Sequence, residues 1–455
     1  MNGKPPAKQP ANTRGTGAPK KAKGGQADKK IAFLKIVSKV AALVIMPAFT
    51  MHSLFTGKKW RGLKDHFGWV PLVEKKPGQK LVWMHALSLG EVNGAAPVLK
   101  ILRDKRPHIM IVVSVTTDAG YDAAHRLIPF ADHIFFHPLD CWPFINRALD
   151  RIKPDLYVLT DTGFWPSMLM NLKDRRIPPM VFNGRISEKS QARYKRVAAM
   201  VKPLLQSFAV ICMQSERGRT TIQNLGAPPN RVRIVGDTKF DALQIVSASE
   251  RVRLRERFRF PPDGQVLVAG STHAGEEKIC VEAYLKLRRK FPKLSMVIAP
   301  RRLERVGEIV KFLIKENVKF VLRSQIDPRS KPMANIVVLD TLGELTKVYA
   351  IADVAFVGRS LNAPGGGHNL LEPVAQCKPV LHGPYIENNQ KIASELKAQG
   401  LAFTVSDDQT LFAAVRKLLL DTDELPKLQE KANAYVQSKR GSSLEIAKYI
   451  VAILK

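Results

Sequence analysis

Short apolar, β-rich runs alternate with helical stretches along the chain from Lys80 onward. The first series of candidate strands covers residues 81–85, 110–115, 133–136, 156–160, 180–183 and 209–213. A second series covers residues 266–269, 296–299, 320–322, 336–339, 354–357 and 380–381. Helical patterning lies between most of these runs, as over residues 95–104. Because such alternation is typical of parallel sheets with helices on both faces, the sequence predicts an α/β fold with doubly wound sheets.

The two series are separated by residues 236–262, which are polar, rich in arginine and without a strand pattern. A chain of 455 residues also exceeds what one hydrophobic core usually supports. We therefore expect two doubly wound domains, over residues 57–245 and 246–455, with ligands at the carboxyl ends of the strands. Residues 425–455 are predicted to be helical and can return to the first domain.

Two unusual segments precede the first strand. Residues 1–30 combine lysine and arginine with Gly, Pro, Ala and Gln, a composition that predicts a disordered basic tail. Residues 31–56 are apolar but carry Lys35 and Lys39 near their start. Three interpretations are open: a secretory signal, a soluble core helix, or a helix that spans or lies in a membrane interface with its lysines at the headgroups. The last fits best, so we expect a membrane-associating helix.

The net charge of +32 broadens the range of partners that we expect. Such a surface favours nucleic acid, anionic lipid headgroups or phosphorylated substrates. A nucleic-acid-binding protein is an alternative that we disfavour, because only 7% of the residues are aromatic and no recognised DNA or RNA module is present. The cysteines, at positions 141, 212, 280 and 377, are scattered without the paired spacing of a metal site, so we expect no metal and reduced, cytoplasmic thiols.

Residues 340–373 can be interpreted as one nucleotide-recognition unit. The apolar run at residues 354–357 predicts a buried strand. The three glycines at 365–367 make a loop whose backbone can approach a ligand closely. A helix expected to begin near His368 and Asn369 would direct its free N–H groups at a phosphate, while Glu372 would accept hydrogen bonds from ribose hydroxyls. The alternative is that the glycines form only a turn and Glu372 is only a first-turn acid.

A series of ordered motifs runs from about residue 60 to residue 405. They are HALSLGEV at 85–92, NGRISEKSQARY at 183–194, GDTKFD at 236–241, STHAGEE at 271–277, PRRLER at 300–305, DTLGEL at 340–345 and GGHNLLEP at 366–373. In these motifs the chain resembles the Kdo transferases of glycosyltransferase family 30. Those enzymes transfer 3-deoxy-D-manno-oct-2-ulosonic acid (Kdo) from CMP-Kdo to the lipid A precursor.

The resemblance implies a GT-B fold, in which two Rossmann-like domains face a central cleft, and an N-terminal membrane-associating segment. It implies inversion at the anomeric carbon of Kdo, with CMP-Kdo as the donor and no cofactor. The expected partners are CMP-Kdo, the lipid A precursor and an anionic membrane surface, and nucleic acid is not expected. The expected location is the cytoplasmic face of the inner membrane of a Gram-negative bacterium, while the oligomeric state stays open.

The resemblance also implies roles for individual residues. Glu91 matches the family's general base, Asp161 the position assigned to transition-state stabilisation, and Lys239 the lysine that offsets charge on the departing phosphate. The nucleotide contacts match Pro300, Arg301, Leu342, Gly343, Glu344, Asn369, Leu370, Leu371 and Glu372. Simpler interpretations are a helix-start acid for Glu91 and Glu344 and a solvated side chain for Lys239.

The chain departs from the family before and after its Trp-Pro pair. The family usually has two glutamates before that pair, whereas this chain has Asp161, on a shorter arm, and Gly163. Ser167 also replaces an amide, and Arg302 stands where the family often has histidine. Asp161 and Gly163 favour the alternative of another GT-B glycosyltransferase with a different nucleotide-sugar donor or lipid acceptor.

A basic group follows the candidate strand at 180–183. Arg185, Lys189, Arg193 and Lys195 can bind the phosphates of lipid A, or they can form a solvated helix face. The sequence leaves both interpretations open.

Overall fold

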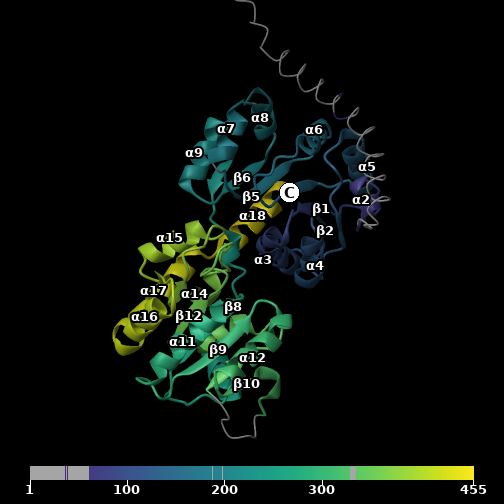
Figure 1. Ribbon diagram of the computed structural model, residues 1–455. Coiled ribbons are helices and arrows are strands. Elements are labelled where there is room, and N and C mark those ends of the chain that lie inside the picture. Colours follow the sequence, from purple (N-terminus) through teal and green to yellow (C-terminus); the bar gives the residue numbers. More distant parts are fainter. Residues whose placement is uncertain (1–35, 37, 39–60, 187, 197, 328–334) are drawn as a thin grey trace, which may run out of the picture.

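The computed structural model describes residues 36, 38, 61–186, 188–196, 198–327 and 335–455. The predicted basic tail (1–30) and membrane-associating helix (31–56) lie outside these residues, except for Ile36 and Ser38. The described chain forms two seven-stranded sheets in which paired strands run parallel (Figure 1). The predicted α/β fold with two doubly wound sheets is therefore confirmed.

The first sheet has the strand order β3-β2-β1-β4-β5-β6-β7. Its strands are β1 (Leu81–His85), β2 (Met110–Val115), β3 (His133–Phe136), β4 (Leu156–Leu159), β5 (Pro179–Gly184), β6 (Val210–Met213) and β7 (Val232–Ile234). Central strand β1 is buried along its whole length, as expected for a parallel strand covered on both faces. Trp83 at its middle pairs in register with Val112 of β2 and Tyr157 of β4.

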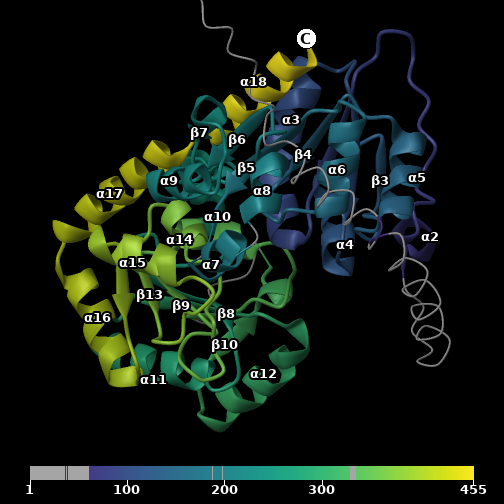
Figure 2. The ribbon, with the colours of Figure 1, turned by 90° about the horizontal axis from the view of Figure 1, so that it is seen from above.

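Helices cover both faces of the first sheet (Figures 1 and 2). They are α2 (Leu63–His66), α3 (Leu89–Lys105), α4 (Asp118–Leu127), α5 (Trp142–Ile152), α6 (Pro166–Asp174), α7 (Glu188–Arg196), α8 (Ala198–Leu205) and α9 (Glu216–Asn224), with short 3₁₀ turns η1 (Pro229–Arg231) and η2 (Thr238–Phe240). Residues of α5, α6 and α8 form one hydrophobic cluster with the sheet, and residues of α3 and α4 form another. Alternate β1 residues, Trp83 and Met84, enter opposite clusters, as the period of two in a strand requires.

The second sheet has the strand order β10-β11-β9-β8-β12-β13-β14. Its strands are β8 (Val266–Thr272), β9 (Ser295–Pro300), β10 (Phe320–Leu322), β11 (Ile336–Val338), β12 (Val354–Val357), β13 (Val380–His382) and β14 (Ala402–Thr404). Its helices are α10 (Ala248–Arg257), α11 (Glu276–Arg288), α12 (Val306–Lys315), α13 (Leu345–Ile351), α14 (Leu371–Ala375), α15 (Gln390–Ala398), α16 (Asp408–Leu420) and α17 (Glu424–Lys439), with 3₁₀ turns η3 (Leu303–Arg305) and η4 (Arg323–Gln325). One continuous hydrophobic cluster joins these elements.

The last helix, α18 (Ser442–Leu454), leaves the second domain and packs on the first. Its apolar residues, including Ile446 and Ile450, join the same cluster as Leu99 of α3. Figure 2 shows α18 beside α3. The expected second-domain range, 246–455, is therefore corrected at its end, because the apolar stripe of α18 is buried in the core of the first domain.

Each predicted strand is present, and several have the predicted bounds, including β1 and β12. The strands β7 and β14 were not predicted, because each has only three residues, of which one is buried. The helix expected near His368 begins only at Leu371 and spans five residues. No helix in the described part of the chain is long and apolar enough to cross a membrane.

Candidate active site

Glu91 lies in the first turn of α3, just after the carboxyl end of β1. One carboxylate oxygen, Oε2, accepts hydrogen bonds from the N–H of Leu87 and the hydroxyl of Thr160, each at 2.8 Å. The other oxygen, Oε1, has no hydrogen bond to any described residue. Burial raises the pKa of Glu91 above its ordinary value of 4.5, although both hydrogen bonds act in the opposite direction. One oxygen thus anchors the side chain at the helix start, and the other can accept a proton.

Asp161 follows β4 and lies close to Glu91. Its Oδ2 accepts a hydrogen bond from Arg185 Nε at 3.0 Å, and its Oδ1 accepts one from the N–H of Thr162 at 2.7 Å. The negative charge of Asp161 raises the pKa of Glu91 and the positive charge of Arg185 lowers it, so both groups lie within electrostatic range of Glu91. The structure therefore brings two of the three predicted catalytic residues together.

Arg185 is the member of the predicted basic group whose side chain the structure describes. Its guanidinium is largely exposed and forms an ion pair with Asp161. The side chains of Lys189, Arg193 and Lys195 lie outside the described part of the chain. Arg185 is thus positioned beside the carboxylates at the carboxyl end of the first sheet.

Gly163 and Ser167, two of the departures from the family, have different environments. A Cβ on Gly163 would have only one neighbour within 4 Å, Trp165 Nε1 at 3.8 Å, so open space lies where the family has a second glutamate. Ser167 is buried, and its N–H and hydroxyl donate to Asp140 Oδ2 and to the Asp140 carbonyl. Ser167 therefore contributes to the start of α6, whereas Gly163 changes the exposed surface beside Asp161.

Lys239 lies on η2, in the segment that connects the two domains. Its N–H donates to Asp237 Oδ1 at 2.9 Å, which fixes the turn. The turn also packs on the first domain, because the hydroxyl of Thr238 accepts a hydrogen bond from Asn183 Nδ2 at 2.7 Å. A Cβ on Gly94 of α3 would lie 2.9 Å from that same hydroxyl, so only glycine allows the turn to approach the helix that carries Glu91 so closely.

The predicted nucleotide contacts lie at the carboxyl ends of strands in the second sheet. Pro300 ends β9, and the N–H of exposed Arg301 donates to the carbonyl of Thr272, the last residue of β8. After β11, Leu342 is 83% exposed and Gly343 has a φ of 81°. Arg301, Leu342 and Gly343 are therefore accessible to a ligand, whereas Pro300 is buried.

Glu344 is the N-cap residue of α13, as the simpler interpretation of this acid suggested. Its Oε1 accepts a hydrogen bond from Arg323 at 3.2 Å, and its Oε2 accepts one from the Thr341 hydroxyl. The carboxylate is therefore already engaged within the protein.

The segment after the glycine loop differs from the prediction. Leu371 begins α14. Its N–H donates a hydrogen bond to Asn369 Oδ1 at 3.1 Å, so this donor is not free to bind a phosphate. The helix ends after five residues because Cys377 adopts a left-handed φ of 62°. Asn369 also donates to Glu372 Oε1 at 3.2 Å, and burial raises the pKa of Glu372. Leu370 and Leu371 are buried.

Sequence reasoning assigned no role to His273, Glu276 and His368, which converge at the ends of β8 and β12. The Nε2 atoms of His273 and His368 lie 3.0 Å apart, and their rings stack with an interplanar angle of 29°. Glu276 is 1% exposed and accepts backbone hydrogen bonds from both loops. The STHAGEE and GGHNLLEP motifs contain these residues, but the two histidines that pair are 95 positions apart in the chain.

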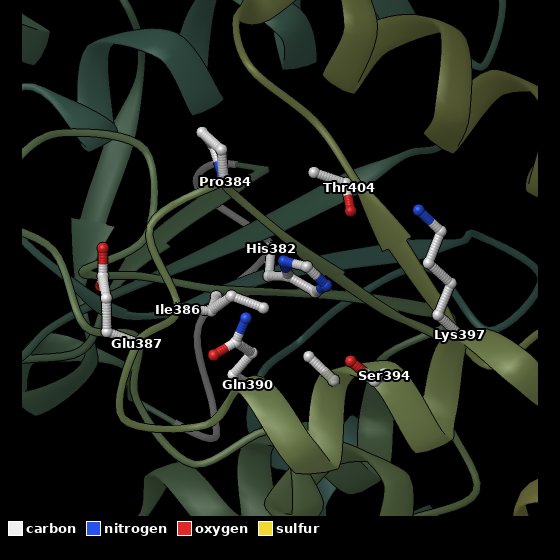
Figure 3. A pocket seen from close by; sticks show the side chains of 9 residues that line it. His382, Pro384, Ile386, Glu387, Gln390, Ser394, Lys397 and Thr404 are labelled. Carbon is white, nitrogen blue, oxygen red and sulfur yellow. The ribbon is translucent and has the colours of Figure 1, made fainter.

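A separate pocket of about 330 Å³ lies beside β13, β14 and α15. Figure 3 shows that His382, Gln390, Ser394 and Lys397 are among its lining side chains. None of the predicted site residues lines it. Asn389, next in the chain to the lining residue Gln390, donates to the carbonyls of Gly367 and His368 in the glycine loop, each at 2.9 Å.

Comparison with known proteins identifies the family. Residues 61–242 match the family model described as 3-deoxy-D-manno-octulosonic-acid transferase (kdotransferase). A 3-deoxy-D-manno-octulosonic acid transferase of Haemophilus influenzae is 30% identical over 385 residues, which cover 84% of this chain and 88% of that protein. The chain belongs to the Kdo transferase family.

Two further proteins are similar to this chain. A bifunctional glycosyltransferase/methyltransferase of Fusobacterium nucleatum is 33% identical over 81% of this chain, which spans only 57% of the length of that relative. The structure of a UDP-GlcNAc 2-epimerase from Neisseria meningitidis superposes with a TM-score of 0.55 over 83% of this chain and 99% of that one, at 16% identity. The second similarity shows the fold alone.

As a member of the Kdo transferase family, the protein is a glycosyltransferase with the GT-B fold. Its two groups of candidate residues lie at the carboxyl ends of the first and second sheets, as doubly wound folds place ligands. Within the described residues, no group of three or more His, Cys, Asp or Glu side chains is arranged to hold a metal ion.

Proposed function

We propose that this glycosyltransferase transfers Kdo from CMP-Kdo to a lipid A precursor in lipopolysaccharide core biosynthesis, with inversion at the anomeric carbon. The observation that carries the proposal is the geometry of Glu91, whose Oε2 is fixed by Leu87 and Thr160 while Oε1 has no hydrogen bond to a described residue. Kdo is proposed as the transferred sugar because the matched family and the Haemophilus influenzae relative are both described as 3-deoxy-D-manno-octulosonic acid transferases.

In the proposed reaction, Glu91 removes the proton from the acceptor hydroxyl. The hydroxyl oxygen forms a bond to the anomeric carbon of Kdo, and the bond from that carbon to the CMP phosphate breaks with its electron pair leaving on the phosphate. Lys239 and Arg301 offset the charge that develops on CMP, and Asp161 stabilises the positive character of the sugar in the transition state. The raised pKa of Glu91 makes its carboxylate a stronger base than an exposed glutamate.

The second domain is proposed to hold the nucleotide. The exposed guanidinium of Arg301 offers a planar fork to the phosphate, and the Leu342-Gly343 backbone lies open at the end of β11. Glu372 lies near Arg301, whose charge lowers the pKa of this carboxyl against the larger effect of burial. A carboxylate held there by Asn369 is suited to accept hydrogen bonds from ribose hydroxyls.

Substitution of Glu91 tests the proposed role of the base. Glu91→Gln and Glu91→Ala should lower transfer by about 10²–10⁴-fold, the usual contribution of a general base, and should leave CMP affinity nearly unchanged. Product formation from CMP-Kdo and a lipid A precursor is followed by mass spectrometry, with and without EDTA because the proposal includes no metal, and CMP binding by calorimetry. Glu74→Gln, at an exposed position of the same domain, is the matched control. Wild-type activity in the Glu91 variants would reject Glu91 as the base.

A different sugar nucleotide is the second candidate function. The open space at Gly163 and the Asp161–Arg185 ion pair favour it, because both change the surface where the family has two glutamates. Assay of the purified protein with CMP-Kdo against UDP-sugars separates the two donors. Turnover of a UDP-sugar without turnover of CMP-Kdo would replace the first proposal with the second.

We also propose that the enzyme works at the cytoplasmic face of the inner membrane, on an anionic lipid surface. The supporting feature is a patch formed by Trp69, Leu72, Arg147 and Arg151. Trp69 and Leu72 are 55% and 57% exposed, and the guanidinium carbons of Arg147 and Arg151 lie 4.5 Å and 5.7 Å from the centre of the Trp69 ring. Exposed tryptophan next to arginine is typical of surfaces that contact lipid headgroups.

A further inference from the structure

Arg359, two residues after the end of β12, adopts a left-handed backbone conformation with a φ of 59°. This conformation favours glycine, because a Cβ crowds the backbone there, so an arginine at this position costs stability. Strained residues of this kind persist where the surrounding structure fixes them, and they concentrate at functional sites. The strain at Arg359 therefore calls for both a structural support and a function.

Glu276 supplies the support. Its Oε2 accepts hydrogen bonds from the N–H groups of Arg359 and His273, each at 2.8 Å. Its Oε1 accepts bonds from the N–H groups of Ser360, at 2.8 Å, and Leu361, at 3.0 Å. A single buried carboxylate thus fixes the loops after β8 and β12 and holds Arg359 in its strained conformation.

The surroundings of the Arg359 guanidinium indicate a function. Its charge acts on both His273 and His368, so it lies beside this pair of imidazoles. Burial lowers the pKa of His368 to about 4, with smaller contributions from Arg301, His273 and Arg359, so His368 is neutral near pH 7. Burial also lowers the pKa of His273. The cations of this cluster are therefore its guanidinium groups rather than its imidazoles.

Arg301 and Arg359 are both exposed, and no described residue forms an ion pair with either guanidinium. Glu372 is near Arg301, but no hydrogen bond joins the two. Two guanidinium groups around one neutral imidazole pair form a site for two neighbouring negative charges, because each can bind an anionic group through a pair of N–H donors.

We propose that Arg359, next to the His273–His368 pair, binds the carboxylate of the donor sugar, while Arg301 binds the phosphate. The inference rests on the proposed function. In CMP-Kdo the anomeric carbon carries both the sugar carboxylate and the oxygen of the phosphate, so the donor presents two adjacent negative charges, whereas CMP presents only the phosphate. Arg359 is then a residue that distinguishes a sugar acid from a neutral sugar.

The test compares the donor with CMP in the full-length enzyme. Arg359→Gln should raise the KM for CMP-Kdo by about 10–100-fold, the range expected for loss of a charge-assisted hydrogen-bonded pair, and should change the inhibition constant of CMP by less than about threefold. Arg359→Gly should have the same effect on the KM without lowering the melting temperature, because glycine removes the backbone strain. A purely structural role for Arg359 would not produce this combination.

Two controls define the comparison. Arg301→Gln should weaken CMP and CMP-Kdo together, because phosphate is common to both, and Arg302→Gln, at an exposed neighbouring position, should change neither. Equal weakening of CMP and CMP-Kdo in Arg359→Gln, or no weakening of either, would overturn the assignment to the carboxylate. If the wild-type enzyme turns over CMP-Kdo and the Arg359 variants keep its KM, this inference fails alone. If the wild-type enzyme does not use CMP-Kdo, the proposed function fails with it.

Discussion

The carboxyl group of Glu91 is subject to opposing effects on its pKa. Burial raises the pKa, and the neighbouring charge of Asp161 raises it further. The hydrogen bonds from Leu87 and Thr160 lower it, as does the charge of Arg185. Burial is the largest effect, so the pKa lies above 4.5. The residues around Glu91 thus adjust the pH at which it becomes the ionised base.

This balance predicts shifts of opposite sign in two variants. Only ionised Glu91 can accept a proton, so kcat/KM should rise with pH through its pKa. Thr160→Val removes a hydrogen bond that stabilises the carboxylate, and the rise should move to higher pH. Asp161→Asn removes a neighbouring negative charge, and the rise should move to lower pH. The measurement is the pH profile of kcat/KM for each variant, and shifts in the same direction would contradict Glu91 as the titrating base.

At the level of elements, the sequence predicts the buried strands well and the short elements poorly. The apolar runs of β1 and β12 are buried on both faces, so their bounds are visible as uninterrupted hydrophobic stretches. The edge strands β7 and β14 have exposed positions and no such run. The glycine loop and Glu372 were recognisable, but the length of α14 was not, because it is set by the left-handed Cys377. Glu276 resembles any first-turn acid in sequence, since its partners at 359–361 are distant along the chain.

The segment that carries Trp69, residues 67–73, is hydrogen-bonded along α5. The side chains of Arg147 and Arg151 donate to the carbonyls of Phe67 and Val70, at 2.9 Å and 2.5 Å, and the Val73 N–H donates to the Arg151 carbonyl. These bonds hold Trp69 on the outer surface with arginines beside it. Ser38 contacts the start of the same helix, because its hydroxyl accepts a hydrogen bond from the N–H of Trp142 at 2.8 Å.

If this patch contacts lipid, removal of its apolar groups should weaken membrane binding. Trp69→Ser combined with Leu72→Ser should lower partitioning of the full-length protein onto vesicles of phosphatidylglycerol and phosphatidylethanolamine by on the order of tenfold or more, since burial of one large apolar side chain contributes about 1.5–3 kcal/mol. Ile314→Ser, at a position 65% exposed in the second domain, is the matched control and should have no effect. Sedimentation with vesicles measures both, and equal partitioning of the double variant and the wild type would remove the patch from the proposed membrane surface.

In the whole molecule, the chain passes between the domains twice, and Asp241 joins the two passages. Its Oδ1 and Oδ2 accept hydrogen bonds from the N–H groups of Gly441 and Ser443, each at 2.7 Å. Phe240 packs edge-on against Tyr435 of α17, with ring centres 5.9 Å apart. The first passage carries Lys239, so the position of this lysine is tied to the return of the chain into α18. The sequence motif GDTKFD contains both residues, but the second passage, some 200 positions later, could not be predicted from it.

Loss of this connection should impair catalysis more than folding. Asp241→Ala leaves the Gly441 and Ser443 N–H groups at the start of α18 without their acceptor, at a cost of about 1 kcal/mol in the free energy of unfolding. Because Lys239 and the two halves of the site would then be less well aligned, kcat should fall by about tenfold or more, while the KM for each substrate changes little. Asp407→Ala removes a comparable helix cap from α16, within the second domain, and should lower the melting temperature similarly with kcat unchanged. Equal kcat values in the two variants at matched losses of stability would show that Asp241 only caps a helix and does not position Lys239.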